Sequence, residues 1–168
     1  GIQFTDNTTG SKLELGNDGT TEIRQSHATN PTLKYYTNET NDDAMVTVYQ
    51  DRITTTDATV TVLKSVSIAT PDTSTWYFEA TIIGSWNGGS AGVNSDGCAY
   101  KIAGTFRNAA GTVAQIGTTT ILVSNETQTT YDSNFNINVT SIEVRVAGML
   151  NHTMSWSLSE LKVSFVNL

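Results

Sequence analysis

Two histidines and one cysteine are the residues from which a zinc or nucleophilic centre in this 168-residue chain would have to be built. A zinc site needs several His or Cys ligands at short, defined spacing, and His27, Cys98 and His152 are far apart in the sequence. His27 lies in a polar segment, and His152 lies in a short link between two expected strands. We therefore expect both histidines to be solvated loop residues, and we expect neither a zinc site nor an internal disulfide.

The segment Gly88-Gly89-Ser90-Ala91-Gly92 matches the G-x-S-x-G pattern of a nucleophile elbow. That mechanism requires a strand before the serine and a helix after it, so that the hydroxyl stands exposed beside an oxyanion hole. Residues 93–97 are Val-Asn-Ser-Asp-Gly, which form loops rather than helices. Because the chain is rich in Gly and Ser, we interpret the match as accidental and do not expect Ser90 to be catalytic.

Carboxylates offer two further kinds of site. A glycosidase needs two acids held across a cleft, but five acids of residues 58–168 are expected in loops or, for Glu143, on an outward strand face: Asp96, Glu126, Asp132, Glu143 and Glu160. Calcium ligands occur around Asn17-Asp18 and around Asn38, Asn41, Asp42 and Asp43, without EF-hand spacing. No phosphate-binding glycine loop occurs either. We expect no enzymatic activity, no metal and no cofactor.

Recognition is better supported than catalysis, by the segment from Ser85 to Gly97. It has 13 residues, four of them glycine, and loops of that length in a compact β domain are often functional. An aromatic ring can stack on a sugar while polar neighbours bond its hydroxyls. The candidate ligand-binding residues are Trp86, Asn87, Asn94, Ser95 and Asp96. The alternative is that Trp86 folds back over the end of the domain and caps its core.

The composition indicates which elements must position these residues. Only 15% of the chain is charged, against about a quarter in a typical domain, and Thr and Ser account for 44 of 168 residues. Such a sequence favours strands over helices. No apolar run is long enough to span a membrane, and no signal peptide is visible. Since Gly1 replaces the usual Met, we expect a processed chain or a fragment.

Charge limits the partners. The net charge is −7, and the nine Lys and Arg residues are scattered singly. Nucleic-acid binding requires clustered cations to neutralise phosphates. We therefore expect no nucleic-acid partner.

The chain divides into two regions near Asp57. Residues 1–57 contain 15 apolar residues (26%), against 48 of 111 (43%) in residues 58–168. The first region consists of very short strands between turns, and it buries too little surface to fold alone. Such a segment borrows a core from the second region or from identical chains around a symmetry axis. We favour an intertwined stalk of identical chains; a loosely attached meander is the alternative.

The second region shows period-two alternation in strand after strand. Residues 113–123 are less regular and form either two strands or one bulged strand. The sequence predicts an all-β fold, an antiparallel, jelly-roll-like β-sandwich of about eight strands. The expected inward-facing residues are Val60, Val62, Val66, Ile68, Trp76, Phe78, Ala80, Ile82, Cys98, Tyr100, Ile102, Gly104, Phe106, Phe135, Ile137, Val139, Ile142, Val144, Val146, Met154, Trp156, Leu158, Leu161, Val163 and Phe165.

Residues 54–166 resemble domains of tailed-bacteriophage structural proteins, in particular tail fibres, spikes and capsid appendages. The resemblance is carried by Ala58–Val62, Trp76–Ala80, Gly97–Phe106 with the polar turn to Gly111, Ile142–Gly148 and Thr153–Trp156. Upstream, Ile2–Asp6 and Ala44–Ile53 resemble the stalk sequences of trimeric fibres. Heptad or collagen-like stalk repeats are missing, as is an aromatic-rich tip beyond Trp86.

The resemblance implies a non-enzymatic virion component, exposed on the particle surface, that forms a homotrimer and contacts other virion proteins. Its function would be attachment to host-surface carbohydrate as part of a fibre or spike. The alternative is a capsid decoration or head-fibre protein with a purely structural, protein-binding role. Neither reading involves nucleic acid or a membrane.

Overall fold

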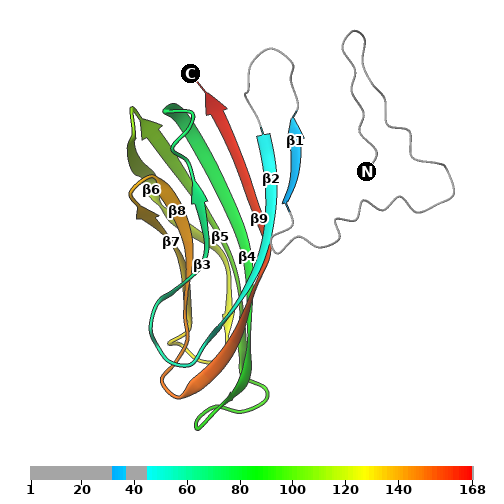
Figure 1. The fold of residues 1–168 in the computed structure, drawn as a ribbon. Helices are drawn as coiled ribbons and strands as arrows, with labels where there is room; N and C mark the ends of the chain where they lie inside the picture. Colours follow the sequence, from blue (N-terminus) through cyan, green and yellow to red (C-terminus); the bar gives the residue numbers. More distant parts are fainter. Residues whose placement is uncertain (1–31, 37–44, 168) are drawn as a thin grey trace, which may run out of the picture.

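The computed structural model describes residues 32–36 and 45–167 (Figure 1). Every regular element in these two ranges is a β-strand, and none of the described residues forms a helix that could cross a bilayer. The strands are β1 (Thr32–Tyr36), β2 (Met45–Thr55), β3 (Thr61–Ser67), β4 (Thr73–Gly89), β5 (Gly97–Ala109), β6 (Thr112–Glu126), β7 (Asp132–Asn138), β8 (Ser141–Ala147) and β9 (His152–Asn167).

The strands form two antiparallel sheets that pack face to face, and the predicted β-sandwich is confirmed. The larger sheet has the order β1-β2-β9-β4-β5-β6, and the smaller has the order β3-β8-β7. The consecutive strands β2 and β3 lie in different sheets: β2 pairs with β9 in the larger sheet, and β3 pairs with β8 in the smaller one. This arrangement results when one long antiparallel pair, with the arms β2–β3 and β8–β9, folds over into two sheets. In contrast, β4, β5 and β6 form an up-and-down meander. Figure 1 shows the smaller sheet lying across one face of the larger one.

The core lies between the sheets and follows the predicted alternation in most strands. In β4, Trp76, Phe78, Ala80 and Ile82 are buried, and their odd-numbered neighbours point to the outer face. A group of aromatic rings occupies the centre, where Phe78, Phe106 and Phe135 contact one another edge to face at centroid distances of 5.5–6.0 Å. This geometry is favourable for aromatic pairs. The predicted inward residues of β5, β8 and β9 are buried as well.

In β3 the predicted alternation is wrong at its start. Val60 and Val62 are exposed, and Leu63 is buried instead. The register between β3 and β8 shifts between Val62 and Lys64, which marks a β-bulge at Leu63. A bulge inserts one residue and so exchanges the two faces of the strand. Residues after it, Val66 and Ile68, are buried as expected.

A second bulge lies in β9. The apolar residues of 154–158 and of 161–165 belong to this one strand and are separated by the bulge. Leu158 pairs with Ile82 and Glu160 with Thr81, so that Ser159 is the extra residue of a bulge. The Ser159 hydroxyl donates to the carbonyl of Thr81 (3.1 Å), and its own carbonyl accepts from Gln50 Nε2 (3.1 Å). The bulge moves the buried positions from 154, 156 and 158 to 161, 163 and 165.

The two other irregular segments also differ from simple alternation. Residues 113–123 belong to the single bulged strand β6, one of the two alternatives considered. Val139, expected to point inward, is 82% exposed, because β7 ends at Asn138 and Val139 lies in the turn to β8 with φ of 55°.

Part of the expected N-terminal segment belongs to the sandwich. Residues 45–55 form β2, which pairs with β9 along most of its length. The indole N–H of the buried Trp156 donates to Thr55 Oγ1 (2.9 Å), so the end of β2 is fixed to the core. These residues therefore share the core of the second region. Residues 1–31 and 37–44, with the rest of the expected stalk, lie outside the described residues, and the division at residue 57 stays a prediction.

Candidate functional site

The predicted recognition loop is shorter than its composition indicates. Strand β4 continues to Gly89 because Gly88 and Gly89 still pair with Thr153 and His152 of β9. Trp86 is therefore a strand residue paired with Met154, and Asn87 occupies a bulge beside it. The connection between β4 and β5 consists of residues 90–96, which we call the end loop. In Figure 1 it lies at the end of the sandwich where β4 meets β5.

Trp86 holds the end loop in place. Its ring is half-buried against the core, and its Nε1–H donates to the carbonyl of Ala91 (3.0 Å). Gly92 lies so close to the ring that a Cβ there would be 2.5 Å from Nε1 of Trp86 and 2.8 Å from Cε1 of His152, and its φ is +86°. Only glycine fits such a backbone position. This geometry corresponds to the capping alternative; direct contact of Trp86 with a sugar stays a prediction.

Asp96 is the second anchor of the end loop, and it is 5% exposed. Its carboxylate accepts hydrogen bonds from the backbone N–H of Val93 (2.9 Å) and from Nε2 of Gln128 (3.1 Å). The Val93 N–H, followed by the Gln128 amide, holds the pKa of the carboxyl below its ordinary value, because both bonds favour the charged form. With its acceptor oxygens engaged inside the protein, Asp96 positions the loop.

The remaining predicted residues point to solvent. Asn87, Asn94 and Ser95 are all exposed at this end of the sandwich. The structure thus divides the five candidates into two anchors, Trp86 and Asp96, and three exposed polar groups. A polar loop that is held from beneath can present hydrogen-bonding groups in a fixed arrangement, which lowers the entropy lost on binding.

His152 is buried, and its prediction as a solvated residue is wrong. It is 2% exposed, and its Nδ1 lies 2.9 Å from the hydroxyl of the equally buried Tyr131. The physical reason is that β9 begins at His152, so the residue has the same inward orientation as Met154 and Trp156. His152, Met154 and Trp156 are every second residue of the sequence, and this alternation is the signal from which the burial of His152 could have been predicted. His27 lies outside the described residues.

Cys98 lies on the inner face of β5, as predicted. Burial raises the pKa of its thiol to about 12, so that the thiol is neutral at physiological pH and a poor nucleophile. Ser90 is exposed at the start of the end loop, and the residues after it form a turn rather than a helix. These positions do not match the geometry of a nucleophile elbow.

Glu143 lies on the outward side of β8 as predicted, but it is only 5% exposed. Its carboxylate accepts from Asn138 Nδ2 (2.8 Å) and forms an ion pair with Arg145 (2.6 Å). These two partners lower the pKa of Glu143, which indicates a structural carboxylate that stays charged. Glu126 accepts a hydrogen bond from the hydroxyl of Tyr100.

In residues 32–36 and 45–167 no three His, Cys, Asp or Glu side chains are grouped closely enough to hold a metal; the candidate calcium ligands at 17–18 and 38–43 lie outside these ranges.

We expect replacement of Asp96 with Asn to loosen the end loop while the sandwich stays folded. The neutral amide is a weaker acceptor for the Val93 N–H and for Gln128. Amide hydrogen exchange at Val93 should accelerate severalfold, and Asp72→Asn, an exposed aspartate before β4, should leave it unchanged. Since the pKa of Asp96 is lowered in the folded state, the wild-type loop should keep its protection above pH 3.8 and lose it as the pH falls through the lowered pKa. Unchanged exchange at Val93 in Asp96→Asn would show that the carboxylate does not order the loop.

Comparison with known proteins gives one distant structural likeness. No protein-family model matches the sequence, and no curated protein matches it. Among solved structures, the chain is similar to the tailspike protein of Acinetobacter baumannii phage AM24, with a TM-score of 0.45 and 10% sequence identity. The similar region covers 73% of this chain and 26% of the tailspike, so the match spans about a quarter of that protein's length.

Proposed function

We propose that this chain is a non-enzymatic attachment module of a phage virion, a fibre or spike domain that binds carbohydrate on the host surface. The observation that carries the proposal is the end loop, in which the half-buried Trp86 and the buried Asp96 hold exposed polar groups at one end of a β-sandwich. The sequence resemblance of residues 54–166 to fibre, spike and capsid-appendage domains supports the virion location. A homotrimer would place three such loops side by side and raise the avidity of weak individual sites.

Binding of the full chain to an array of bacterial surface glycans tests this proposal. In the double variant Asn94→Ala/Ser95→Ala we expect about thirtyfold weaker binding, because each of the two hydroxyl-bonding groups contributes about 1 kcal/mol. Ser90→Ala, an exposed serine of the same loop outside the predicted set, is the matched control and should bind as the wild type does. A wild-type chain that binds no glycan and does not compete with adsorption to bacteria would overturn the proposal.

A structural role in capsid decoration is the second candidate, and strand β6 favours it. This strand lies at the edge of the larger sheet, and it carries four large apolar residues that are 38–57% exposed: Ile116, Ile121, Leu122 and Val123. An exposed edge with apolar side chains is suited to contact with another protein. This candidate predicts binding to purified virion shells rather than to glycans, with loss of binding when Ile121 and Leu122 are replaced by Asp.

A further inference from the structure

A depression of about 320 Å³ lies on the outer face of the larger sheet, far from the end loop. It is lined by Tyr77 of β4, by Ala103 and Gly104 of β5, and by residues of β6. Its volume falls within the range of about 300–1,000 Å³ that is typical of small-molecule sites. Tyr77 and Trp86 are nine positions apart on β4, so the two places are separated by up to about 30 Å along the strand.

The strand register explains why the sheet is hollowed here. Side chains that face each other across strands form rows on the outer face, and one row runs from Glu79 through Ala103 to Thr120. Ala103 is small, whereas the adjacent row consists of Tyr77, Thr105 and Ile116. The methyl group of Ala103 therefore forms a low point between taller neighbours.

A bulge in β6 widens the depression. Thr105 pairs with Ile116 and Ala103 with Thr120, so that the single residue Gly104 faces residues 117–119. Gly117 has φ of +73°, a left-handed conformation that favours glycine, and no described atom lies within 4 Å of the position where its Cβ would be. Thr118 and Thr120 line the depression on this side.

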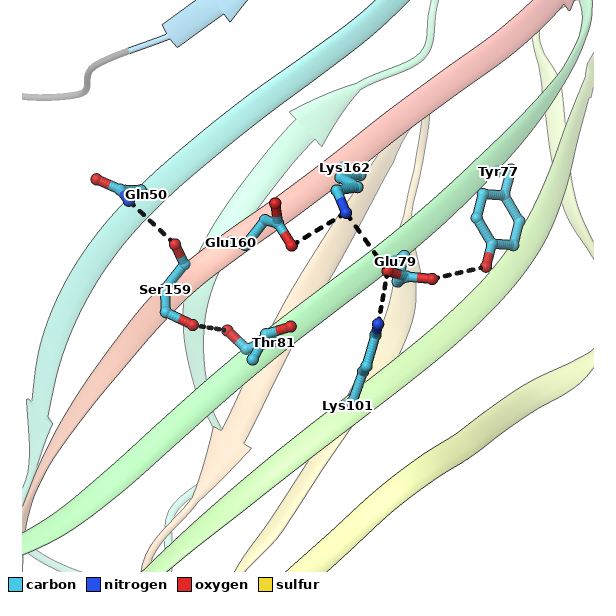
Figure 2. A network of polar contacts seen from close by, with 8 residues as sticks. All are labelled: Gln50, Tyr77, Glu79, Thr81, Lys101, Ser159, Glu160 and Lys162. Carbon is cyan, nitrogen blue, oxygen red and sulfur yellow. Dashed lines mark hydrogen bonds and ion pairs between the residues drawn. The ribbon is translucent and has the colours of Figure 1, made fainter. Parts of the chain in front are cut away.

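Tyr77 supplies a flat aromatic surface beside the depression. Its hydroxyl donates to Oε2 of Glu79 (3.2 Å), two residues further along the same face of β4 (Figure 2). Figure 2 shows the ring face-on from the outer side of the larger sheet, so that one ring face lies toward the sheet and the other toward solvent. The residue is 42% exposed. Glu79 is fixed in turn by Lys101 (3.0 Å) and, at 4.0 Å, by Lys162.

The chemistry around the ring fits a neutral sugar. One face of a pyranose carries C–H groups that stack on an aromatic ring, while its hydroxyls extend sideways to polar partners. Threonine hydroxyls both donate and accept hydrogen bonds, and three of them line the depression, from Thr105, Thr118 and Thr120. Four of the charged groups beside it form ion pairs with one another, Glu79 and Glu160 with Lys101 and Lys162. The residues that line the depression itself carry no charge.

We infer that the depression beside Tyr77 is a second saccharide site, which takes a neutral pyranose unit with Tyr77 as the stacking platform. The inference deepens the proposed function and rests on it for its biological meaning, because a host glycan would then be held at two places on one subunit. Binding at this site does not depend on the end loop, so the two can be tested separately.

The test is a titration of the isotopically labelled full chain with methyl glycosides of glucose, galactose, mannose and N-acetylglucosamine, followed by amide chemical shifts. We expect shifts at Ala103, Gly104 and Gly117 with at least one neutral probe. In Tyr77→Ala the apparent affinity should fall about tenfold, which corresponds to the loss of one aromatic stacking contact. Tyr77→Phe keeps the ring and should retain most of the affinity. Ile83→Ala, an exposed apolar residue of the same strand and face, is the matched control and should not change binding.

The outcomes separate this inference from the proposed function. Shifts that are confined to residues 90–96 would overturn the second site and leave the attachment function supported. The absence of shifts with every neutral probe, or shifts at Ala103 with glucuronate or sialic acid alone, would also overturn it. If shifts at the depression disappear in Tyr77→Ala while the wild-type chain fails to compete with adsorption, the saccharide site stands and the proposed attachment function is wrong.

Discussion

Replacement of Phe78 with Ala is expected to lower the free energy of unfolding by about 3–5 kcal/mol, the range for truncation of a buried phenylalanine. Phe78 is fully buried, and it contacts Phe106 of the same sheet and Phe135 of the opposite sheet edge to face. The substitution therefore removes two aromatic contacts and leaves a cavity between the sheets. The loss is a large part of the 5–15 kcal/mol that stabilises a typical domain.

Chemical denaturation followed by tryptophan fluorescence measures this effect, since Trp76, 6.5 Å from Phe78 between ring centroids, is part of the same core. Tyr77→Ala is the matched control: it truncates an aromatic residue at the neighbouring position, whose side chain points to the outer face. We expect it to change stability by less than about 1 kcal/mol. Similar losses in the two variants would show that the two faces of β4 are not divided as described.

The alternation of apolar residues predicted the buried face of a strand wherever the strand is regular. In β4 every expected residue from Trp76 to Ile82 is buried. The prediction failed at Val62 because a bulge at Leu63 exchanges the two faces, and nothing in the order of side chains marks where a backbone takes one extra residue. The Ser159 bulge is visible in the sequence only as a break in the alternation between Leu158 and Leu161, and such a break is equally typical of a boundary between two strands.

The candidate site was predicted in part. The polar residues Asn94 and Ser95 are exposed at the end of the sandwich, as a recognition loop requires. The start of the loop was predicted too early because Gly88 and Gly89 resemble loop residues, although they belong to β4, where β9 approaches closely. The depression beside Tyr77 could not be predicted at all, since it depends on the pairing of Ala103 with Thr120, which only the register of β5 and β6 defines.

Removal of β2 is the second change with a large expected effect. We expect residues 58–168 alone to be less stable than residues 45–168 by on the order of 5 kcal/mol, and to aggregate. Without β2, the eight paired positions along β9 lose their partners, and β9 becomes an exposed edge strand. The indole N–H of buried Trp156 also loses Thr55, and an unsatisfied buried donor costs about 1–3 kcal/mol. Lys64 loses its 3.1 Å ion pair with Asp51.

Light scattering and thermal unfolding of three chains, 1–168, 45–168 and 58–168, would locate both the end of the folded unit and the site of self-association. If 58–168 is a monomer as stable as 45–168, β2 is an accessory strand and the division at residue 57 is a true domain boundary. A stable, monomeric 45–168 beside a full chain of three times 18.1 kDa would assign trimer formation to residues 1–44. A trimer that persists in 45–168 would instead assign it to the sandwich, where the exposed apolar residues of β6 provide a surface for it. The same three masses therefore decide whether trimer formation depends on residues 1–44, which precede β2, or on the sandwich to which β2 belongs.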